Sequence, residues 1–260
     1  MVNAHRTVAN AWPGDGLWYD AHVTEQDAIE SWQKLAAVLC KHWNAFAADI
    51  VNEPVHASWG RNSPKDWNKA AERIGNAVLQ VCPRLLIFVQ GVSGNPGAPN
   101  DGGEAQGYFW GENLVGARAT PVKLRDMSKL VYSPHTYGPG VFPDQPYFPT
   151  CKGGGCKHQA PQFPKNMPAI WDNHFGFLAD QSGHAIVVGE VGKLSHFVSL
   201  LTSPSASLPR VLLLSPRGPL LPATFDPACD TLLQPHLVSS RIPHLAVWRF
   251  LYRCRHAVAG

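Results

Sequence analysis

Residues 49–54 read Asp-Ile-Val-Asn-Glu-Pro, and residues 187–190 read Val-Val-Gly-Glu. Each stretch is a short apolar run of the kind found in buried strands, and each ends abruptly on a carboxylate, Glu53 or Glu190. A glutamate after one such run is usually a solvated strand end. Two of them point further, because the carboxyl ends of parallel strands meet at one rim of a barrel. The pair therefore predicts two carboxylates at the catalytic rim of a parallel β-barrel.

A third apolar run lies between these two. Residues 130–132 (Leu-Val-Tyr) lead into residues 133–137, Ser-Pro-His-Thr-Tyr. Because side chains alternate along an extended segment, His135 and Tyr137 are expected on the same face. A single histidine in such a place is more often structural than functional. Three strand ends that together carry His, Tyr and two carboxylates predict one shared site.

Helical patterns separate the apolar runs. Thr24 is expected to cap a helix, with Asp27 in the capping-box position. The apolar residues that follow at helical spacing are Ile29, Trp32, Ala36, Leu39 and Trp43. A second helix is predicted from Ser63-Pro64 to Pro83, and a third over residues 170–181. The predicted strands are 45–51, 85–89, 130–132 and 185–188, and residues 93–107 are predicted to form a long loop. This alternation favours a parallel sheet with helical crossovers.

The three motifs also carry a resemblance to a known family. Asn-Glu-Pro at 52–54, His-Thr-Tyr at 135–137 and Gly-Glu at 189–190 resemble the strand ends of retaining glycoside hydrolases, and more closely glycoside hydrolase family 5, the cellulase family. Residues 85–91, 132–142 and 166–172 also resemble microbial endoglucanases of that family. The resemblance covers about residues 5–192 and implies an α/β fold, a (β/α)8 TIM barrel of the glycoside hydrolase type.

Set against that barrel, the chain is expected to be incomplete. His5 and Arg6 would lie near the end of the third strand, so the first two strands and most of the third are absent, and the last strand is unrecognisable. Residues 1–192 are therefore interpreted as a partial catalytic domain. Residues 193–260, rich in Leu, Ser and Pro and with Trp248 as their one tryptophan, are interpreted as a tail of doubtful homology, expected to be poorly ordered. A frame-shifted, mis-spliced or unrelated segment and a divergent natural ending are both open.

Hydrolysis of a glycosidic bond needs two carboxyl groups in different protonation states, and a retaining enzyme holds them about 5 Å apart. The resemblance implies that Glu53 is the acid/base and Glu190 the nucleophile. It further implies that Asn52 binds the sugar 2-hydroxyl and that Tyr137 orients Glu190. His135 and His5 are expected beside the pair and are placed in the substrate-binding set.

Three tryptophans are candidates for lining a sugar subsite. Trp59 follows Glu53 on the same loop and is placed in the substrate-binding set, and Trp18 and Trp110 are further candidates. Packing in the core or in a loop explains each of them equally well. Gln90 departs from the family pattern, since related cellulases often carry glutamate in this Phe-Val-Glu-Gly string.

The resemblance implies an endo-β-1,4-glucanase that cleaves cellulose or a related β-glucan through a glycosyl-enzyme intermediate. Within the class, a mannanase or other β-glycanase is the alternative, because subsite contacts rather than the two glutamates select the sugar. The alternative outside the class is an inactive truncated family member or a carbohydrate-binding remnant, since lost strands leave unpaired sheet edges. No cofactor is expected.

The charge balance argues against a nucleic-acid partner. The chain has 22 Lys+Arg and 19 Asp+Glu, but residues 1–192 hold 15 basic and 17 acidic side chains, so the excess belongs to the tail. There is no apolar run of about 18 residues, so no membrane partner is expected. Residues 1–6 lack the pattern of a secretory signal. The expected partner is a polysaccharide, the expected state a monomer, and the location extracellular by family resemblance alone.

Six cysteines in 260 residues do not make a disulfide scaffold. Cys151 and Cys156 bracket a Lys-Gly-Gly-Gly stretch, and either a local disulfide or two free thiols fits that spacing. A structural zinc would need more ligands than the nearby His158 supplies, so no metal is predicted.

Overall fold

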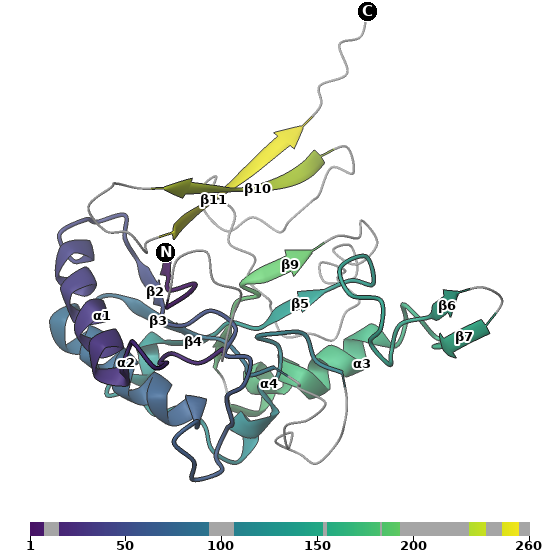
Figure 1. Cartoon of the computed structure of the whole chain (residues 1–260), viewed down its shortest axis with the longest axis horizontal. Coiled ribbons are helices and arrows are strands. Elements are labelled where there is room, and N and C mark those ends of the chain that lie inside the picture. The colour runs from purple at the N-terminus through teal and green to yellow at the C-terminus, as the bar shows by residue number, and fades with distance from the viewer. Residues whose placement is uncertain are drawn as a thin grey trace, which may run out of the picture.

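In the computed structural model, residues 1–7, 16–93, 107–152, 155–182, 184–192, 229–237 and 246–254 are described. A mostly parallel sheet runs through the molecule (Figure 1). Its parallel strands lie side by side in the order β1 (Val2–Asn3), β2 (Ala47–Asp49), β3 (Leu86–Val89), β4 (Leu130–Tyr132) and β8 (Ala185–Ile186). The predicted α/β fold with a parallel sheet is confirmed, and the described part of this sheet holds five parallel strands.

Two strands from the C-terminal segment extend this sheet at β1. β11 (Ala246–Cys254) pairs antiparallel with β1, and β10 (Cys229–Leu237) pairs antiparallel with β11. Trp248 lies in β11. The division of the chain near residue 192, and the expected poor order of the tail, stay predictions.

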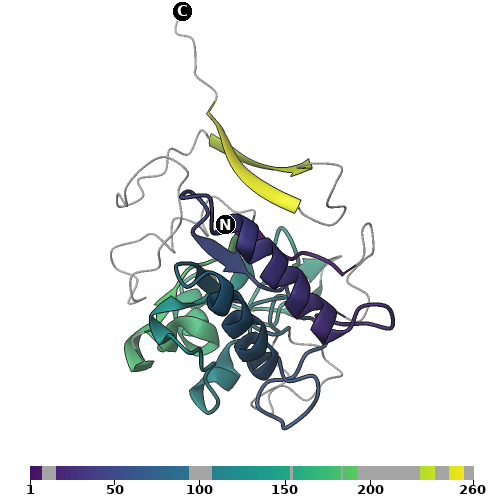
Figure 2. The same ribbon diagram turned by 90° about the vertical axis from the view of Figure 1, so that its left-hand side faces the viewer.

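Two helices cover one face of the sheet, as the views in Figures 1 and 2 agree. Helix α1 (Glu25–Leu39) begins with the predicted capping box, in which Thr24 and Asp27 exchange hydrogen bonds between side chain and backbone. Helix α2 (Trp67–Val81) begins after Asp66. The predicted start at Ser63-Pro64 is wrong, because Ser63 and Asp66 form a turn in which the Asp66 N–H donates to the Ser63 carbonyl.

Shorter helices follow the second half of the chain. They are the 3-10 helices Val115–Arg118 and Met127–Lys129, then α3 (Met167–Trp171), the π-helix Asp172–Gly176 and α4 (Phe177–Ser182). The helix predicted over 170–181 is therefore three consecutive helical pieces. No helix within the described ranges is long and apolar enough to cross a membrane.

The core has two layers on the two faces of the sheet. One face packs Ile50, Ile87 and Tyr132 against the helices. The other carries a smaller apolar cluster, Ala47, Phe88, Val131 and Val187, as expected for the filled interior of a barrel.

The ends of α1 and α2 are joined by a disulfide that sequence reasoning missed. Cys40 and Cys82 are the residues that follow the two helices, and their sulfur atoms are bonded. The Arg84 guanidinium donates to the Leu39 and Cys40 carbonyls at the end of α1 and to the His42 and Ala45 carbonyls beyond it. Because Arg84 provides hydrogen bonds for carbonyls at the end of α1, the helix can end at Leu39 and the chain can turn. Trp43, predicted on the apolar face of that helix, instead lies beyond its end and is 91% exposed.

Two small sheets complete the fold. β5 (His135–Tyr137) pairs parallel with β9 (Glu190–Gly192), and β6 (Thr150–Lys152) pairs antiparallel with β7 (Gly155–His158). The β6–β7 register places Cys151 opposite Cys156. The side chains of these two cysteines lie outside the described part, so their pairing stays a prediction. Most of the loop predicted at 93–107 also falls outside the described residues.

Candidate active site

Glu53 lies just beyond the end of β2, where the backbone leaves the sheet. The Asn52 N–H donates to the Ala4 carbonyl at 3.0 Å, which ties this segment to the chain beyond β1. Glu53 itself has φ of 45°, in the left-handed region that few residues other than glycine adopt. Its side chain is 12% exposed.

Glu190 reaches the same place from β9. In the parallel pair β5–β9, His135 is directly opposite Glu190, and Tyr137 is opposite Gly192. The predicted strand 185–188 is shorter than expected: β8 ends at Ile186, and Glu190 begins β9 rather than ending β8. Gly189 permits the close approach, because a Cβ there would lie 2.5 Å from Ser133 Oγ and 2.8 Å from His135 Nε2.

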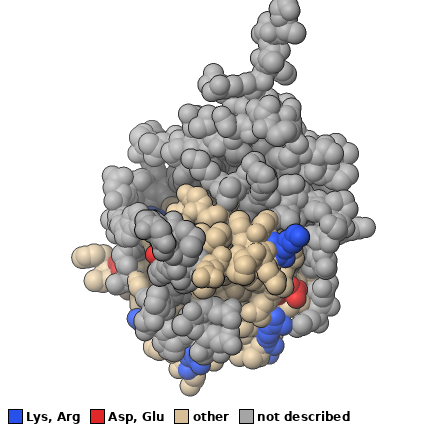
Figure 3. Space-filling model, turned by 90° about the vertical axis from the view of Figure 1, so that its right-hand side faces the viewer, with Lys and Arg blue, Asp and Glu red and all other residues tan. Residues whose placement is uncertain are grey.

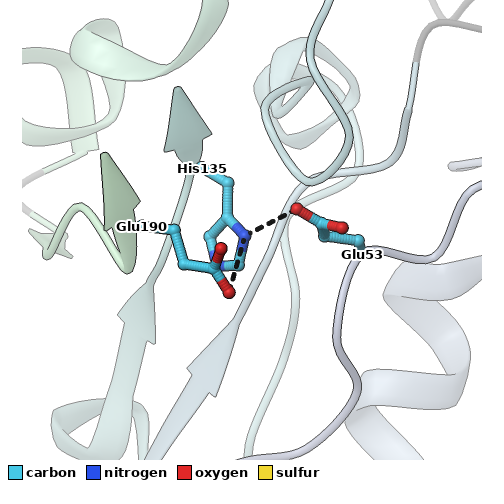
Figure 4. A group of neighbouring side chains, drawn as sticks. All are labelled: Glu53, His135 and Glu190. Carbon is cyan, nitrogen blue, oxygen red and sulfur yellow. Dashed lines mark hydrogen bonds and ion pairs between the residues drawn. The ribbon is translucent and has the colours of Figure 1, made fainter. Parts of the chain in front are cut away.

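The two glutamates converge on one histidine (Figure 4). His135 Nδ1 is 3.0 Å from Glu53 Oε1 and 3.7 Å from Glu190 Oε1. One carboxylate oxygen of each glutamate and a ring nitrogen of His135 all lie within 4.8 Å of one another. Thus two carboxyl groups that are far apart in the sequence lie at the separation of a retaining pair, about 5 Å.

Tyr137 bridges the same pair. Its hydroxyl lies 2.5 Å from Glu190 Oε2, to which it donates, and 3.4 Å from Glu53 Oε1. Burial, and then the charges of Glu190 and Glu53, raise the pKa of Tyr137 far above its usual range. The phenol therefore stays protonated and remains a donor to Glu190.

His135 is 1% exposed, and its surroundings favour the protonated ring. Burial alone lowers the pKa of His135, but the hydrogen bond to Glu53 and the charges of Glu190, Glu53 and Asp49 outweigh burial and raise it above its ordinary value. A protonated ring donates from Nδ1 to Glu53.

The strand that carries His135 and Tyr137 is anchored from behind. Thr136 points away from the site, and its hydroxyl donates to Glu112 Oε1 at 2.9 Å. Glu112 is fully buried and also accepts from the Phe109 N–H. Sequence reasoning gave Glu112 no role, because its partner Thr136 is recognised only once the strand is placed.

The structure also places the two remaining polar candidates at the site. Asn52 is 5% exposed, and its Oδ1 lies 3.4 Å from Gln90 Nε2. His5 Nδ1 is 3.1 Å from Asn3 Oδ1. Burial, followed by the charge of Arg6, lowers the pKa of His5, while Glu190 and Glu53 act in the opposite direction. His5 is thus within electrostatic reach of both glutamates.

The expectation for Trp59 is wrong. Trp59 is 2% exposed, its indole N–H donates to the Thr120 carbonyl at 2.8 Å, and its ring packs near Tyr132. Trp18 is equally buried and packs on Trp67. Both rings belong to the core and offer no face to a sugar. Trp110 is only partly buried and stays a candidate.

Gly111 is a site component that sequence reasoning missed. Its φ is +79°, and an added Cβ would lie 3.2 Å from Gln90 Oε1, 3.2 Å from His135 Cγ and 3.3 Å from Glu53 Cγ. A glycine flanked by Trp and Glu carries no pattern that marks such a contact. The site therefore depends on the backbone of residues 107–113 as well as on the three motifs.

The same three side chains, Glu53, His135 and Glu190, have the composition of a divalent-cation site. A cation there would occupy the space between the two carboxylates. The prediction of no metal stays a prediction.

On the face drawn in Figure 3, the described Lys and Arg side chains are scattered rather than gathered into one large patch.

Comparison with known proteins decides the family. The model of the family Cellulase (glycosyl hydrolase family 5) matches residues 1–200 of this chain. The chain belongs to glycosyl hydrolase family 5.

Curated endoglucanases are similar over most of this chain. An endoglucanase of Paenibacillus polymyxa is 41% identical over 186 residues, which is 69% of this chain and 43% of that protein. The major extracellular endoglucanase of Xanthomonas campestris is 39% identical over 178 residues, 68% of this chain and 33% of that protein. The chain therefore spans less than half the length of these relatives.

Solved endocellulase and endoglucanase structures share the fold. A variant of the endocellulase from Pyrococcus horikoshii in complex with cellotetraose is 38% identical, with a TM-score of 0.63, over 73% of this chain and 51% of that one. The catalytic domain of the major endoglucanase of Xanthomonas campestris is 34% identical, with a TM-score of 0.61, over 77% of this chain and 54% of that one.

Proposed function

We propose that this family 5 chain is a retaining endo-β-1,4-glucanase that cleaves cellulose or a related β-glucan. The observation that carries the proposal is the approach of Glu53 and Glu190 to within 4.8 Å of one another, with His135 between them. The endoglucanase names of the relatives and the cellotetraose complex of the Pyrococcus horikoshii enzyme support this choice of substrate.

In the first step, a Glu190 oxygen attacks the anomeric carbon. The bond from that carbon to the glycosidic oxygen breaks, and a proton passes from Glu53 to the departing oxygen. Tyr137 supports these roles, because its hydrogen bond to Glu190 fixes the direction of the attacking carboxylate. Asn52 is proposed to bind the sugar 2-hydroxyl, and its Nδ2 has no hydrogen-bond partner among the described residues.

In the second step, Glu53, now a carboxylate, takes a proton from water. The water oxygen attacks the anomeric carbon, and the ester bond to Glu190 breaks, so that its oxygen regains the electron pair. The sugar keeps its configuration because the anomeric carbon is attacked twice. His135 and His5 are proposed to hold the two carboxylates in position rather than to transfer protons.

We also propose that the protein acts outside the cell as a monomer. The Cys40–Cys82 disulfide supports an oxidising compartment, and one relative is named as extracellular. Residues 1–192 are proposed to form the catalytic part and residues 193–260 a tail of doubtful homology. Limited proteolysis of the full chain tests this division: cleavage near residue 192 that leaves a stable product supports it, and uniform resistance contradicts it.

The activity is tested with soluble carboxymethyl-cellulose and mannan as parallel substrates. We expect hydrolysis of the glucan, loss of activity below detection in Glu190→Gln, and a loss of about 100- to 10,000-fold in Glu53→Gln. Glu72→Gln is the matched control, because Glu72 lies on α2 and pairs with Lys69. Preference for mannan would overturn the substrate, and unchanged activity in either site variant would overturn the mechanism.

Azide rescue then distinguishes the two glutamates. Azide replaces the missing nucleophile in Glu190→Gly and gives an α-glycosyl azide. In Glu53→Ala it attacks the glycosyl-enzyme instead and gives a β-glycosyl azide. The opposite pairing of product and variant would reverse the two roles.

A further inference from the structure

Gln90 lies directly behind Glu53 and has no part in the two chemical steps. It follows β3, is fully buried, and faces the barrel interior. Its Oε1 accepts the Glu53 backbone N–H at 2.7 Å. Its Nε2 donates to Asp49 Oδ2 at 2.8 Å. One amide thus connects the backbone of a catalytic glutamate to a buried carboxylate.

The bond to Glu53 supports an unusual backbone. Left-handed φ is sparsely populated for residues with a Cβ, so neighbouring groups must hold Glu53 there. Gln90 Oε1 is the partner that the structure gives to this N–H. Losing it would leave a buried donor unpaired and let the peptide rotate toward the common regions of φ and ψ. The Glu53 carboxyl group would move with it.

Asp49 fixes which end of the Gln90 amide faces Glu53. Its Oδ2 accepts from Gln90 Nε2 and, at 2.9 Å, from Asn3 Nδ2. An ionised carboxylate only accepts, so it selects the NH2 end of Gln90 and leaves the carbonyl end for the Glu53 N–H. Asn3 and Asp49 lie in β1 and β2, and Gln90 directly follows the adjacent strand β3, so the three form one polar layer beneath the catalytic residues.

We propose, on the basis of the function proposed above, that Gln90 is a positioning residue for Glu53, and that Asp49 sets the orientation of the Gln90 amide. The pair acts on the acid/base through its backbone and contacts no substrate. Burial raises the pKa of Asp49 to about 6, while His135, Gln90 and Asn3 lower it and the Glu190 charge raises it. Asp49 is therefore ionised, and the amide fixed, above about pH 6.

The leaving group of the substrate provides the test. Proton donation by Glu53 matters for a poor leaving group and not for 2,4-dinitrophenolate, which departs unprotonated. The comparison uses kcat/KM, which covers the steps up to departure of the leaving group and not the later attack of water. In Gln90→Leu we expect kcat/KM on carboxymethyl-cellulose to fall about 100-fold, since a misplacement of about 1 Å costs that much, and kcat/KM on 2,4-dinitrophenyl β-cellobioside to change less than threefold. Equal losses on both substrates would reduce Gln90 to a structural residue and overturn the proposal.

Gln90→Glu is the conservative rescue. Glutamate still accepts the Glu53 N–H, but it meets Asp49 as a second carboxyl group, and the two hydrogen-bond only while they share a proton. Activity on carboxymethyl-cellulose should approach that of the parent at acidic pH and fall as the shared proton is lost. A Gln90→Glu profile parallel to that of the parent at all pH values would contradict the role of Asp49.

Asn68→Leu is the matched control. Asn68 is also a fully buried amide, and its Oδ1 accepts the N–H of Gly60, which has φ of +68°. We expect this variant to lose stability but to keep the parent ratio of the two rates.

If Glu53→Gln shows the leaving-group dependence and Gln90→Leu does not, only the positioning role fails. If neither shows it, the proposed function fails.

Hydrogen exchange at the Glu53 amide provides a readout that needs no activity. We expect the exchange of this N–H to accelerate at least about tenfold in Gln90→Leu and to stay unchanged in Asn68→Leu, measured on the full chain. Unchanged protection of Glu53 in Gln90→Leu would overturn the proposal whatever the rates.

Discussion

The Tyr137 hydroxyl donates to Glu190 Oε2 at 2.5 Å, and the register of β5 with β9 makes this contact possible. The short sheet aligns the two chain segments residue by residue, so the tyrosine lies across from the backbone just past the glutamate. The direction of the glutamate carboxylate is thus set by strand pairing.

Tyr137→Phe should lower kcat by about 10- to 100-fold, because a hydrogen bond to a charged group contributes about 1.5–3 kcal/mol. The pKa of Tyr137 is held far above its usual range, so its ionisation does not set the alkaline limb of the pH–rate profile. We expect Tyr137→Phe to keep that limb at the same pH. A limb that moves with the substitution would show that the phenol titrates during turnover.

Asp49→Asn should make stability less dependent on pH. The pKa of Asp49 is raised from 3.8 to about 6 by burial, so the folded chain holds a proton that the unfolded chain releases. This contribution to stability is present below the ordinary pKa and is lost as pH rises through about 6. The free energy of unfolding of Asp49→Asn, measured in urea relative to the parent, should therefore rise by up to about 3 kcal/mol between about pH 4 and pH 7. A constant difference across that range would argue against a buried, titrating Asp49.

Trp59→Phe tests the reassignment of this tryptophan to the core. The variant loses the N–H bond to Thr120 and some packing volume, so its free energy of unfolding should fall by about 1–3 kcal/mol. KM for cello-oligosaccharides should not change. Trp110→Ala is the comparison, because Trp110 is only partly buried. A KM effect in Trp59→Phe with unchanged stability would restore the sugar-platform interpretation.

The Cys40–Cys82 disulfide closes a loop with a sequence separation of 42 residues. The double variant Cys40→Ser/Cys82→Ser should lose about 4 kcal/mol of unfolding free energy, because the disulfide restricts the unfolded chain. Reducing agent should destabilise the parent and have little further effect on the double variant. A parent that is insensitive to reducing agent would speak against this pairing.

Much of the fold follows from local signals. The Thr24 capping box and the apolar runs at β2, β3 and β4 are local patterns, and the structure has them where they were expected. Element ends were less predictable. Trp43 continues the helical spacing but lies beyond the end of α1, because spacing does not record where carbonyls find another partner, here Arg84.

In the site, too, residues marked by local patterns could be predicted and those that depend on long-range packing could not. Glu53, His135 and Glu190 could be found because each follows an apolar run, and parallel strands bring such ends together. Trp59 was misassigned because a loop tryptophan looks the same in the sequence whether its ring faces a sugar or Tyr132. The Cys40–Cys82 pair was missed because it depends on two helices ending side by side. Gly111 depends on long-range packing in the same way.

The most direct test of the central claim, that Glu53 and Glu190 form a retaining pair, is to trap the intermediate. The full chain is incubated with 2,4-dinitrophenyl 2-deoxy-2-fluoro-β-cellobioside, and its intact mass and the labelled peptide are measured. The account predicts one sugar adduct per chain, on Glu190, absent in Glu190→Gln and still formed in Glu53→Gln. An adduct on another residue, or turnover of natural substrate by the parent without any adduct, would contradict it.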